Sequence, residues 1–467
     1  VAMAIIDALE YADMFEEPEV AGPGFINFRL KPEFLTDQLK KMILDERLDI
    51  QKTAAPQRVV VDFSSPNIAK ELHVGHLRST IIGDCIARTL EFIGHDVLRR
   101  NHVGDWGTQF GMLLTHLKVV CPEALQPNST VELGDLVAFY RAAKKRFDED
   151  NAFKERARLE VVNLQSGQAE AVNGWKSLCE ESRKQFDEIY SLLWVQSEEK
   201  GESFYNPFIP STIEELRQKN LVVESDGAQC VYPEGFKNKE GDPLPLIVQK
   251  RDGGFNYDTT DMAAIRYRIR DEKADRIIYV TDAGQAQHFA MIFEAARMAG
   301  WLEGVEAVHV PFGMVLGEDR KKFKTRSGDT VRLRDLLDEA VARARAMVEE
   351  KNAGLPDEKQ DEIARAIGIG AVKYADLSQH RLSDYVFSFD KMLALNGNTA
   401  PYLIYAYVRV RSIVRKGEVD LSSLDWGAMG TLETPEEMDL GKTIVRFPEV
   451  LKILELELLP NRLTDYL

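Results

Sequence analysis

Short apolar runs and longer helical patterns alternate through the middle of the chain. The run 58–63, RVVVDF, has the length and valine content of a buried strand. Apolar residues at helical spacing follow it until Gly94, and a second strand-like run begins at Asp96. Similar strand–turn–helix units return at 276–281 and 306–317. This alternation predicts an α/β fold built on a doubly wound, Rossmann-type parallel sheet with crossover helices.

The pattern also predicts how the chain is divided. Charged helical stretches and a short β-like part interrupt the alternation at 123–255, and beyond Val331 the pattern is helical, with a single helix expected at 435–459. The expected divisions are a helix and an extended run at 1–31, a connector at 32–57, a sheet domain at 58–330 with an insertion at about 123–255, a helical junction at 331–393, and an all-α helical-bundle domain at 394–467.

Composition narrows the class of protein. The chain is 44% hydrophobic and 29% charged, and it has no run of about 18 apolar residues that would span a bilayer. Four scattered cysteines without a CxxC pattern favour reduced thiols and a cytoplasmic location, with an organellar form as the alternative. The net charge of −17 argues against a protein that coats nucleic acid, so an RNA-binding surface would have to concentrate its Lys and Arg locally.

Polar residues gather in the turn after the first strand. This turn places His73 and His76 three residues apart, on one face of the first helical turn. A helix that begins at the carboxyl edge of a parallel sheet offers free N–H groups to a phosphate chain, and Gly75 lets a flat ring approach the backbone. A metal site and simple capping or core roles are the alternatives for the two histidines, but no HExxH pattern, third His or Cys cluster accompanies them.

Two motifs together carry a family resemblance. The stretch SSPNIAKELHVGHLRST resembles the HIGH signature of class I aminoacyl-tRNA synthetases, spelled HVGH here, and is similar to arginyl-tRNA synthetases in particular. The basic loop at about 318–330 contains FKTRS, which resembles a degenerate form of the second class I signature, KMSKS; alone, the loop would be a solvated turn. The resemblance runs from about Arg58 to the C-terminus. Residues 1–31 resemble the end of the family's N-terminal tRNA-contacting domain, and 394–467 the start of its anticodon-binding domain, expected to be incomplete.

This resemblance implies an arginine–tRNA ligase that forms AMP. Such an enzyme activates L-arginine with ATP to arginyl-adenylate and transfers it to the 3′-terminal ribose of tRNA(Arg), usually with tRNA bound first. Mg²⁺ is expected with the ATP, a multi-synthetase assembly is a further possible partner, and no membrane is expected. Two alternatives are another nucleotidyltransferase on the same fold and a retired synthetase that acts as an RNA- or protein-binding scaffold.

The resemblance also implies roles for individual residues. Because a guanidinium is permanently charged and carries five donors, its pocket needs a carboxylate. Asp261 is the expected partner, and a surface ion pair with Arg266 or Arg268 is the alternative. The implied catalytic residues are Lys70, His73, His76 and Lys324; ATP would be bound by His73, Gly75, His76, Lys322 and Lys324, arginine by Ser65, Pro66, Asn67, His76, Tyr257, Asp261 and Gln285, and tRNA by Asn398, Tyr402, Tyr405 and Arg409, with no metal ligand.

Three groups of residues keep two interpretations. In the loop NHVGDWGTQFG, Asp105, Trp106 and Gln109 lie where binding residues gather; the alternative is that Asp105 caps the next helix and Trp106 belongs to the core. The run Arg141, Lys144, Lys145 and Arg146 is either an RNA-binding face or a solvated helix surface. The aromatic residues Tyr402, Tyr405 and Tyr407 alternate with arginines as in base-stacking surfaces, although helical spacing predicts that most of them are core.

Overall fold

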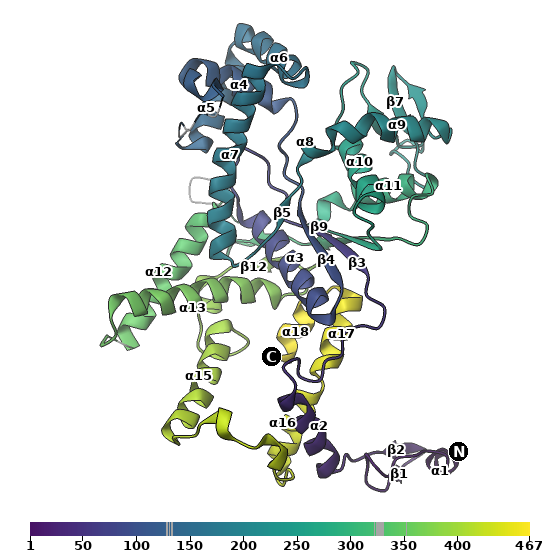
Figure 1. The fold of residues 1–467 in the computed structure, drawn as a ribbon, viewed down its shortest axis with the longest axis vertical. Helices are drawn as coiled ribbons and strands as arrows, with labels where there is room; N and C mark the ends of the chain where they lie inside the picture. The colour runs from purple at the N-terminus through teal and green to yellow at the C-terminus, as the bar shows by residue number, and fades with distance from the viewer. Residues whose placement is uncertain (128, 130, 132–133, 322, 324–330, 352) are drawn as a thin grey trace.

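A five-stranded sheet with all strands parallel forms the centre of the molecule (Figure 1). The computed structural model describes residues 1–467 except 128, 130, 132–133, 322, 324–330 and 352. Across the sheet, the strands are β10 (Glu306–Phe312), β9 (Arg276–Asp282), β3 (Arg58–Asp62), β4 (Asp96–Asn101) and β5 (Glu198–Glu199). The chain first adds β4 and β5 on one side of β3 and then β9 and β10 on the other, so the strand order reverses between β3 and β9. This is the predicted doubly wound sheet, and such a reversal is where ligands bind.

Strand β3 is buried on both of its faces. Val59, Val60 and Val61 are fully buried, with Val59 and Val61 in one hydrophobic core and Val60 in the other. Helix α3 (Val74–Ile93) follows and packs closely on the strand, since a Cβ on Gly83 would lie 2.4 Å from Phe63. The helix ends as predicted at Gly94, which takes the left-handed conformation (φ 109°).

Two lobes stand at the carboxyl edge of the sheet, on the upper left and upper right of Figure 1. The helical lobe contains the predicted charged region 141–158, which Asp150 divides by capping the second of two helices. Strand β5 also comes from the range 123–255, so part of the predicted insertion belongs to the sheet. The helical lobe is α4 (Gln109–Val120), α5 (Leu136–Glu149), α6 (Asn151–Gln165) and α7 (Ala169–Leu192); the other lobe is α8 (Glu202–Tyr205), α9 (Ile209–Gln218), β6 (Val223–Ser225), β7 (Ala228–Val231), β8 (Leu246–Gln249), α10 (Tyr257–Arg270) and α11 (Ala286–Met298).

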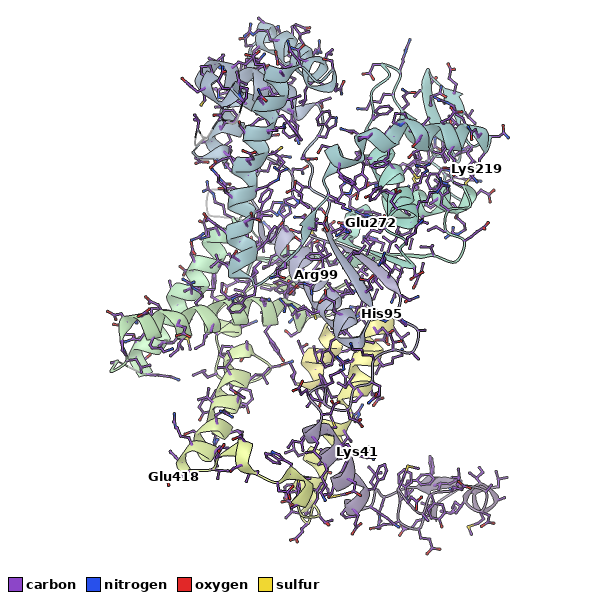
Figure 2. The ribbon with its side chains drawn as sticks, in the orientation of Figure 1. Lys41, His95, Arg99, Lys219, Glu272 and Glu418 are labelled. Carbon is purple, nitrogen blue, oxygen red and sulfur yellow. The ribbon has the colours of Figure 1, made fainter. Side chains whose placement is uncertain are left out.

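The last third of the chain is mainly helical: its first two long helices lie to the left of the sheet in Figure 1, and the later ones lie below it. The single helix predicted at 435–459 is wrong: the chain breaks at Arg446, where Pro448 favours a new helix start. His95, at the foot of the sheet in Figure 2, bonds the Glu455 carboxylate (3.0 Å) and so joins the sheet to this region. The helices are α12 (Leu333–Lys351), α13 (Asp357–Leu377), α14 (Phe389–Met392), α15 (Ala400–Lys416), α16 (Pro435–Val445), α17 (Phe447–Glu457) and α18 (Asn461–Tyr466).

A short strand pair and the N-terminal region complete the fold. A two-residue parallel pair joins β11 (Val315–Leu316) to β12 (Tyr385–Val386), which ties the end of the sheet domain to the helical region. At the N-terminus lie α1 (Ala2–Ile6), the hairpin of β1 (Glu19–Ala21) and β2 (Phe25–Asn27), and α2 (Pro32–Leu44), which packs on α16. A search of the described residues for a helix long and apolar enough to cross a membrane finds none.

Candidate active site

The HVGH turn forms a reciprocal cap at the N-terminus of α3. His73 is the N-cap, and its Nδ1 accepts a hydrogen bond from the Gly75 N–H at 3.0 Å. The Nδ1 of His76 in turn accepts the His73 N–H at 3.0 Å. Since each Nδ1 acts as an acceptor, the proton of each neutral ring lies on Nε2. Both imidazoles therefore carry their donor on the side of the ring away from the helix backbone.

The two rings also influence each other. Their centroids are 3.9 Å apart. Burial, and then the neighbouring His73 and Lys70, lower the pKa of His76 to about 3, so this ring is neutral at physiological pH. A Cβ on Gly75 would lie 2.9 Å from the His73 ring, so a larger residue at this position would clash with that ring. This requirement for glycine adds to the predicted one, space for adenine.

The loop between β3 and α3 is held in an unusual backbone conformation. Ser64 and Ser65 have φ of 73° and 48°, which non-glycine residues rarely adopt. The Ser65 N–H donates to Asn101 Oδ1 (2.9 Å), and its hydroxyl donates to Asp62 (3.1 Å). Asp62 also forms a buried ion pair with Arg268 at 2.6 Å. These bonds at the end of β3 fix Ser65, one of the predicted arginine ligands.

The neighbouring ligand candidates differ in exposure. Pro66 is buried and Asn67 is exposed. A Cβ on Gly104 would lie 2.2 Å from the Asn67 side chain, so only glycine fits between them. Lys70 is exposed, and its amine lies 5.6 Å from the ring centroid of Tyr140 on α5.

The segment 331–333, which follows the basic loop in the sequence, lies beside the histidines. Lys322 and Lys324, both predicted phosphate ligands, lie outside the described residues. The segment that follows the loop runs antiparallel to the HVGH turn, with a bridge between His73 and Arg332 and a 2.8 Å bond from the Leu333 N–H to the Leu72 carbonyl. This contact places Arg332, just after the basic loop, beside the N-cap histidine of α3.

Asp261 lies in a half-buried cluster and not in a surface ion pair. Its carboxylate is 2.7 Å from His288 Nε2, and Asp258 is 3.3 Å from Nδ1 of the same ring. Burial lowers the pKa of His288, but its hydrogen bonds with Asp258 and Asp261 outweigh burial and raise the pKa to about 9. The alternative pairing is wrong, because Arg266 bonds Glu215 (2.8 Å) and Arg268 bonds Asp62.

Two other predicted arginine ligands lie nearby with exposed side chains. The ring centroid of Tyr257 is 5.2 Å from that of His288, and 60% of Tyr257 is exposed. Gln285 is the N-cap of α11, just beyond the end of β9. Both residues thus come from the elements that carry Asp261 and His288.

Glu202 belongs to the site but was not predicted. It opens the short helix α8, directly after β5. Burial, and then the charges of Asp261 and Asp105, raise the pKa of Glu202 to about 8, while a hydrogen bond from the Trp106 backbone lowers it. Within the described residues, no cation contributes to this pKa. Glu202 is therefore a carboxylate whose ionised form is disfavoured in the empty protein.

Comparison with known proteins identifies the family. Residues 38–389 match the family model of the catalytic domain of class I (R) tRNA synthetases, residues 403–467 match the DALR anticodon binding domain, and residues 1–30 match the arginyl tRNA synthetase N terminal domain. The chain belongs to the arginyl-tRNA synthetase family. This membership confirms the predicted family and excludes an unrelated nucleotidyltransferase on the same fold.

Individual relatives agree with this assignment. The arginine–tRNA ligase of Nostoc sp. is 58% identical over 472 residues, covering 100% of this chain and 80% of the relative, and that of Synechococcus elongatus is 59% identical over 473 residues, covering 100% and 81%. Among solved structures, Plasmodium falciparum arginyl-tRNA synthetase superimposes with a TM-score of 0.85 at 36% identity, covering 100% of this chain and 79% of that one. The Thermus thermophilus enzyme gives 0.79 at 26% identity, covering 100% and 80%.

In this synthetase-family chain, the tyrosines of α15 are exposed. Tyr402, Tyr405 and Tyr407 are 43%, 54% and 64% exposed, so the prediction that most of them are core is wrong. Only Ala400 and Pro401, at the start of α15, are buried. Arg409 is exposed on the same helix. Just before α15 begins, the amide oxygen of Asn398 accepts a hydrogen bond from the Tyr374 hydroxyl (2.5 Å).

The basic run on α5 does not form one continuous face. Lys144 pairs with Asp148 at 2.5 Å. Arg146 turns towards the helical lobe, 3.1 Å from the ring of His116 and over the ring of Phe153. An RNA-binding surface formed by this run stays a prediction.

Proposed function

We propose that this chain activates L-arginine with ATP at the carboxyl edge of its parallel sheet and transfers the arginyl group to tRNA(Arg). Family membership supports the overall reaction. The position of the HVGH turn at the strand-order reversal supports the place, since a helix N-terminus there suits a phosphate chain.

The histidines act on the triphosphate. In adenylate formation, the arginine carboxylate attacks the α-phosphate in line, the bond to the bridging oxygen breaks, and pyrophosphate leaves. The Nε2–H groups of His73 and His76 donate hydrogen bonds where negative charge grows, and the neutral state of His76 suits a donor that need not give up its proton. Lys70, Lys322 and Lys324 supply positive charge for the pyrophosphate.

Mg²⁺ enters this scheme together with ATP. Within the described ranges, no group of three or more His, Cys, Asp or Glu is arranged to hold a metal ion. The triphosphate itself, with its oxygen ligands, is the natural ligand of the ion. We assign no resident metal to the protein.

Two carboxylates bind the guanidinium. Asp261 already bonds a protonated His288, so on its own it offers a substrate cation only part of a counter-charge. Glu202 supplies the remainder: burial, and then the charges of Asp261 and Asp105, raise its pKa, and a bound guanidinium counteracts these effects. Tyr257 and Gln285 contact the same substrate, whereas Ser65, Pro66 and Asn67 hold its amino and carboxylate ends.

The anticodon-binding side is α15. Exposed Tyr402 and Tyr405 can stack unpaired bases, and Arg409 and Asn398 can contact the backbone or base edges. Membership of a multi-synthetase assembly and a cytoplasmic location stay predictions from the sequence.

The observation that carries the substrate assignment is the pair Glu202 and Asp261 at the same sheet edge as the HVGH turn. ATP–pyrophosphate exchange, measured with each of the twenty amino acids, tests it. We expect exchange with arginine alone, and only when tRNA(Arg) is present. Exchange driven by another amino acid would overturn the substrate assignment. No exchange, together with retained tRNA binding, would favour the scaffold alternative.

A further inference from the structure

The loop that follows β4 joins the two ends of the proposed arginine pocket. On one side it meets the serine loop: Asn101 Oδ1 accepts the Ser65 N–H (2.9 Å), and the Gly104 N–H donates to the Pro66 carbonyl (2.9 Å). On the other side, the Val103 carbonyl accepts the Glu202 N–H at 3.0 Å. The segment from Asn101, the last residue of β4, to Asp105 therefore contacts both the serine loop and the start of α8.

Asp105 is the side chain that fixes the second of these contacts. It is 2% exposed, and its carboxylate accepts hydrogen bonds from the Ser203 N–H (2.8 Å) and the Ser203 hydroxyl (2.5 Å). A Cβ on Gly201 would lie 2.6 Å from the Asp105 carboxylate, so the chain passes directly over it. Asp105 thus holds the residues on both sides of Glu202. The capping role considered from the sequence is not observed, since the N-cap of α4 is Thr108.

The choice of a carboxylate here is costly for folding. Burial raises the pKa of Asp105, and its charge in turn raises the pKa of Glu202. An asparagine would keep an acceptor for the Ser203 N–H without adding a like charge beside Glu202. A negative group at this position becomes favourable when a cation binds to Glu202.

We propose that Asp105 is a positioning residue for arginine specificity, which holds Glu202 at a fixed distance from Ser65 and Asn67 so that the pocket selects a cationic side chain of arginine's length. The inference rests on the proposed function, because it assigns the guanidinium to Glu202. Asp105 itself touches no substrate in this scheme. It acts through Gly201 and Ser203.

The test measures arginine binding by calorimetry and the KM for arginine and for ATP in tRNA-dependent exchange. For Asp105→Ala, we expect the dissociation constant and the KM for arginine to rise about 10- to 100-fold, as for the loss of two charge-assisted hydrogen bonds, while kcat and the KM for ATP change less than about threefold. Asp105→Asn should restore most of the affinity. The Asp105→Ala protein should discriminate less strongly between arginine and lysine than the unaltered chain does.

Two further variants keep the test decisive. Glu455→Gln removes a buried carboxylate that bonds His95 at the other end of the sheet, and it should lower stability without a selective effect on arginine. Gly201→Ala should reproduce the arginine defect by displacing the first turn of α8, even if Asp105→Ala does not fold. Equal rises in the KM for arginine and ATP, or an Asp105→Ala protein that binds arginine normally, would overturn the inference. Absence of arginine binding by the unaltered chain would overturn the proposed function as well.

Discussion

Replacing Glu202 by Gln tests the arginine pocket most directly. Glutamine keeps the size of the side chain and resembles the protonated acid, but it cannot ionise. In the free protein, Glu202 has a pKa of about 8, so it is mostly protonated at pH 7. A bound guanidinium favours the ionised form, and arginine binding should therefore release this proton.

The size of the effect follows from the pKa. If binding requires ionised Glu202, the affinity of the free protein for arginine rises with pH and levels off above about pH 8. Between pH 6 and pH 8 the expected gain is roughly 50-fold, and about 0.9 proton is released per arginine at pH 7. The Glu202→Gln protein should bind arginine at least about tenfold more weakly at pH 8, with little pH dependence.

The stability of the ligand-free protein should fall as pH rises, whereas its affinity for arginine rises. Because the pKa of Glu202 in the folded protein lies above its ordinary value of 4.5, the unfolded state loses its proton first as pH rises. The folded state thus loses stability between about pH 4.5 and pH 8 and no more beyond. Over the interval to pH 7 this amounts to roughly 3 kcal/mol, so Glu202→Gln should be more stable than the unaltered chain at pH 7 but not at pH 4.5.

Calorimetry in two buffers of different ionisation enthalpy counts the released protons, and thermal unfolding at the two pH values measures the stability change. Glu198→Gln is the matched control, since Glu198 lies nearby on β5 but pairs with Arg100 at 2.6 Å at the surface. It should keep the pH dependence of arginine binding. Arginine binding by the unaltered chain that is independent of pH, with no proton released at pH 7, would refute the role given to Glu202.

Three further predictions concern other parts of the molecule. His76→Ala should slow adenylate formation about 100- to 1000-fold, because a hydrogen-bond donor to the phosphate is lost, with a smaller effect on the KM for arginine. Single-turnover kinetics measure this rate, and an unchanged rate would contradict the prediction. Gly83→Ala places a Cβ 2.4 Å from Phe63 and should lower the free energy of unfolding by roughly 1–3 kcal/mol, measured by denaturant titration. Tyr405→Ala should weaken tRNA binding by about 1–3 kcal/mol in filter assays while arginine binding stays normal, and unchanged tRNA affinity would remove Tyr405 from the interface.

Local pattern was sufficient for the centre of the fold. The valines of β3 and the glycine that ends α3 are signals within one segment, and the structure has both elements where the pattern predicts them. The exposed tyrosines of α15 were misassigned for a different reason. Helical spacing indicates that Tyr402 and Tyr405 share one face of a helix, but it does not show whether another part of the protein covers that face. Among the described residues of α15, only those in its first turn are buried.

Glu202 shows why part of an active site escapes such reasoning. The strand that precedes it, β5, is only two residues long, so no alternation is visible there, and Glu202 falls inside the insertion expected at about 123–255. Glu202 is chemically unusual because it is buried and because Asp261 and Asp105, which are 59 and 97 positions away along the chain, approach it once the sheet has formed. A like-charge cluster costs free energy in the empty protein, and it persists where a cationic ligand can offset that cost. The feature that best indicates a cationic substrate is therefore a property of the folded sheet edge, which no single segment encodes.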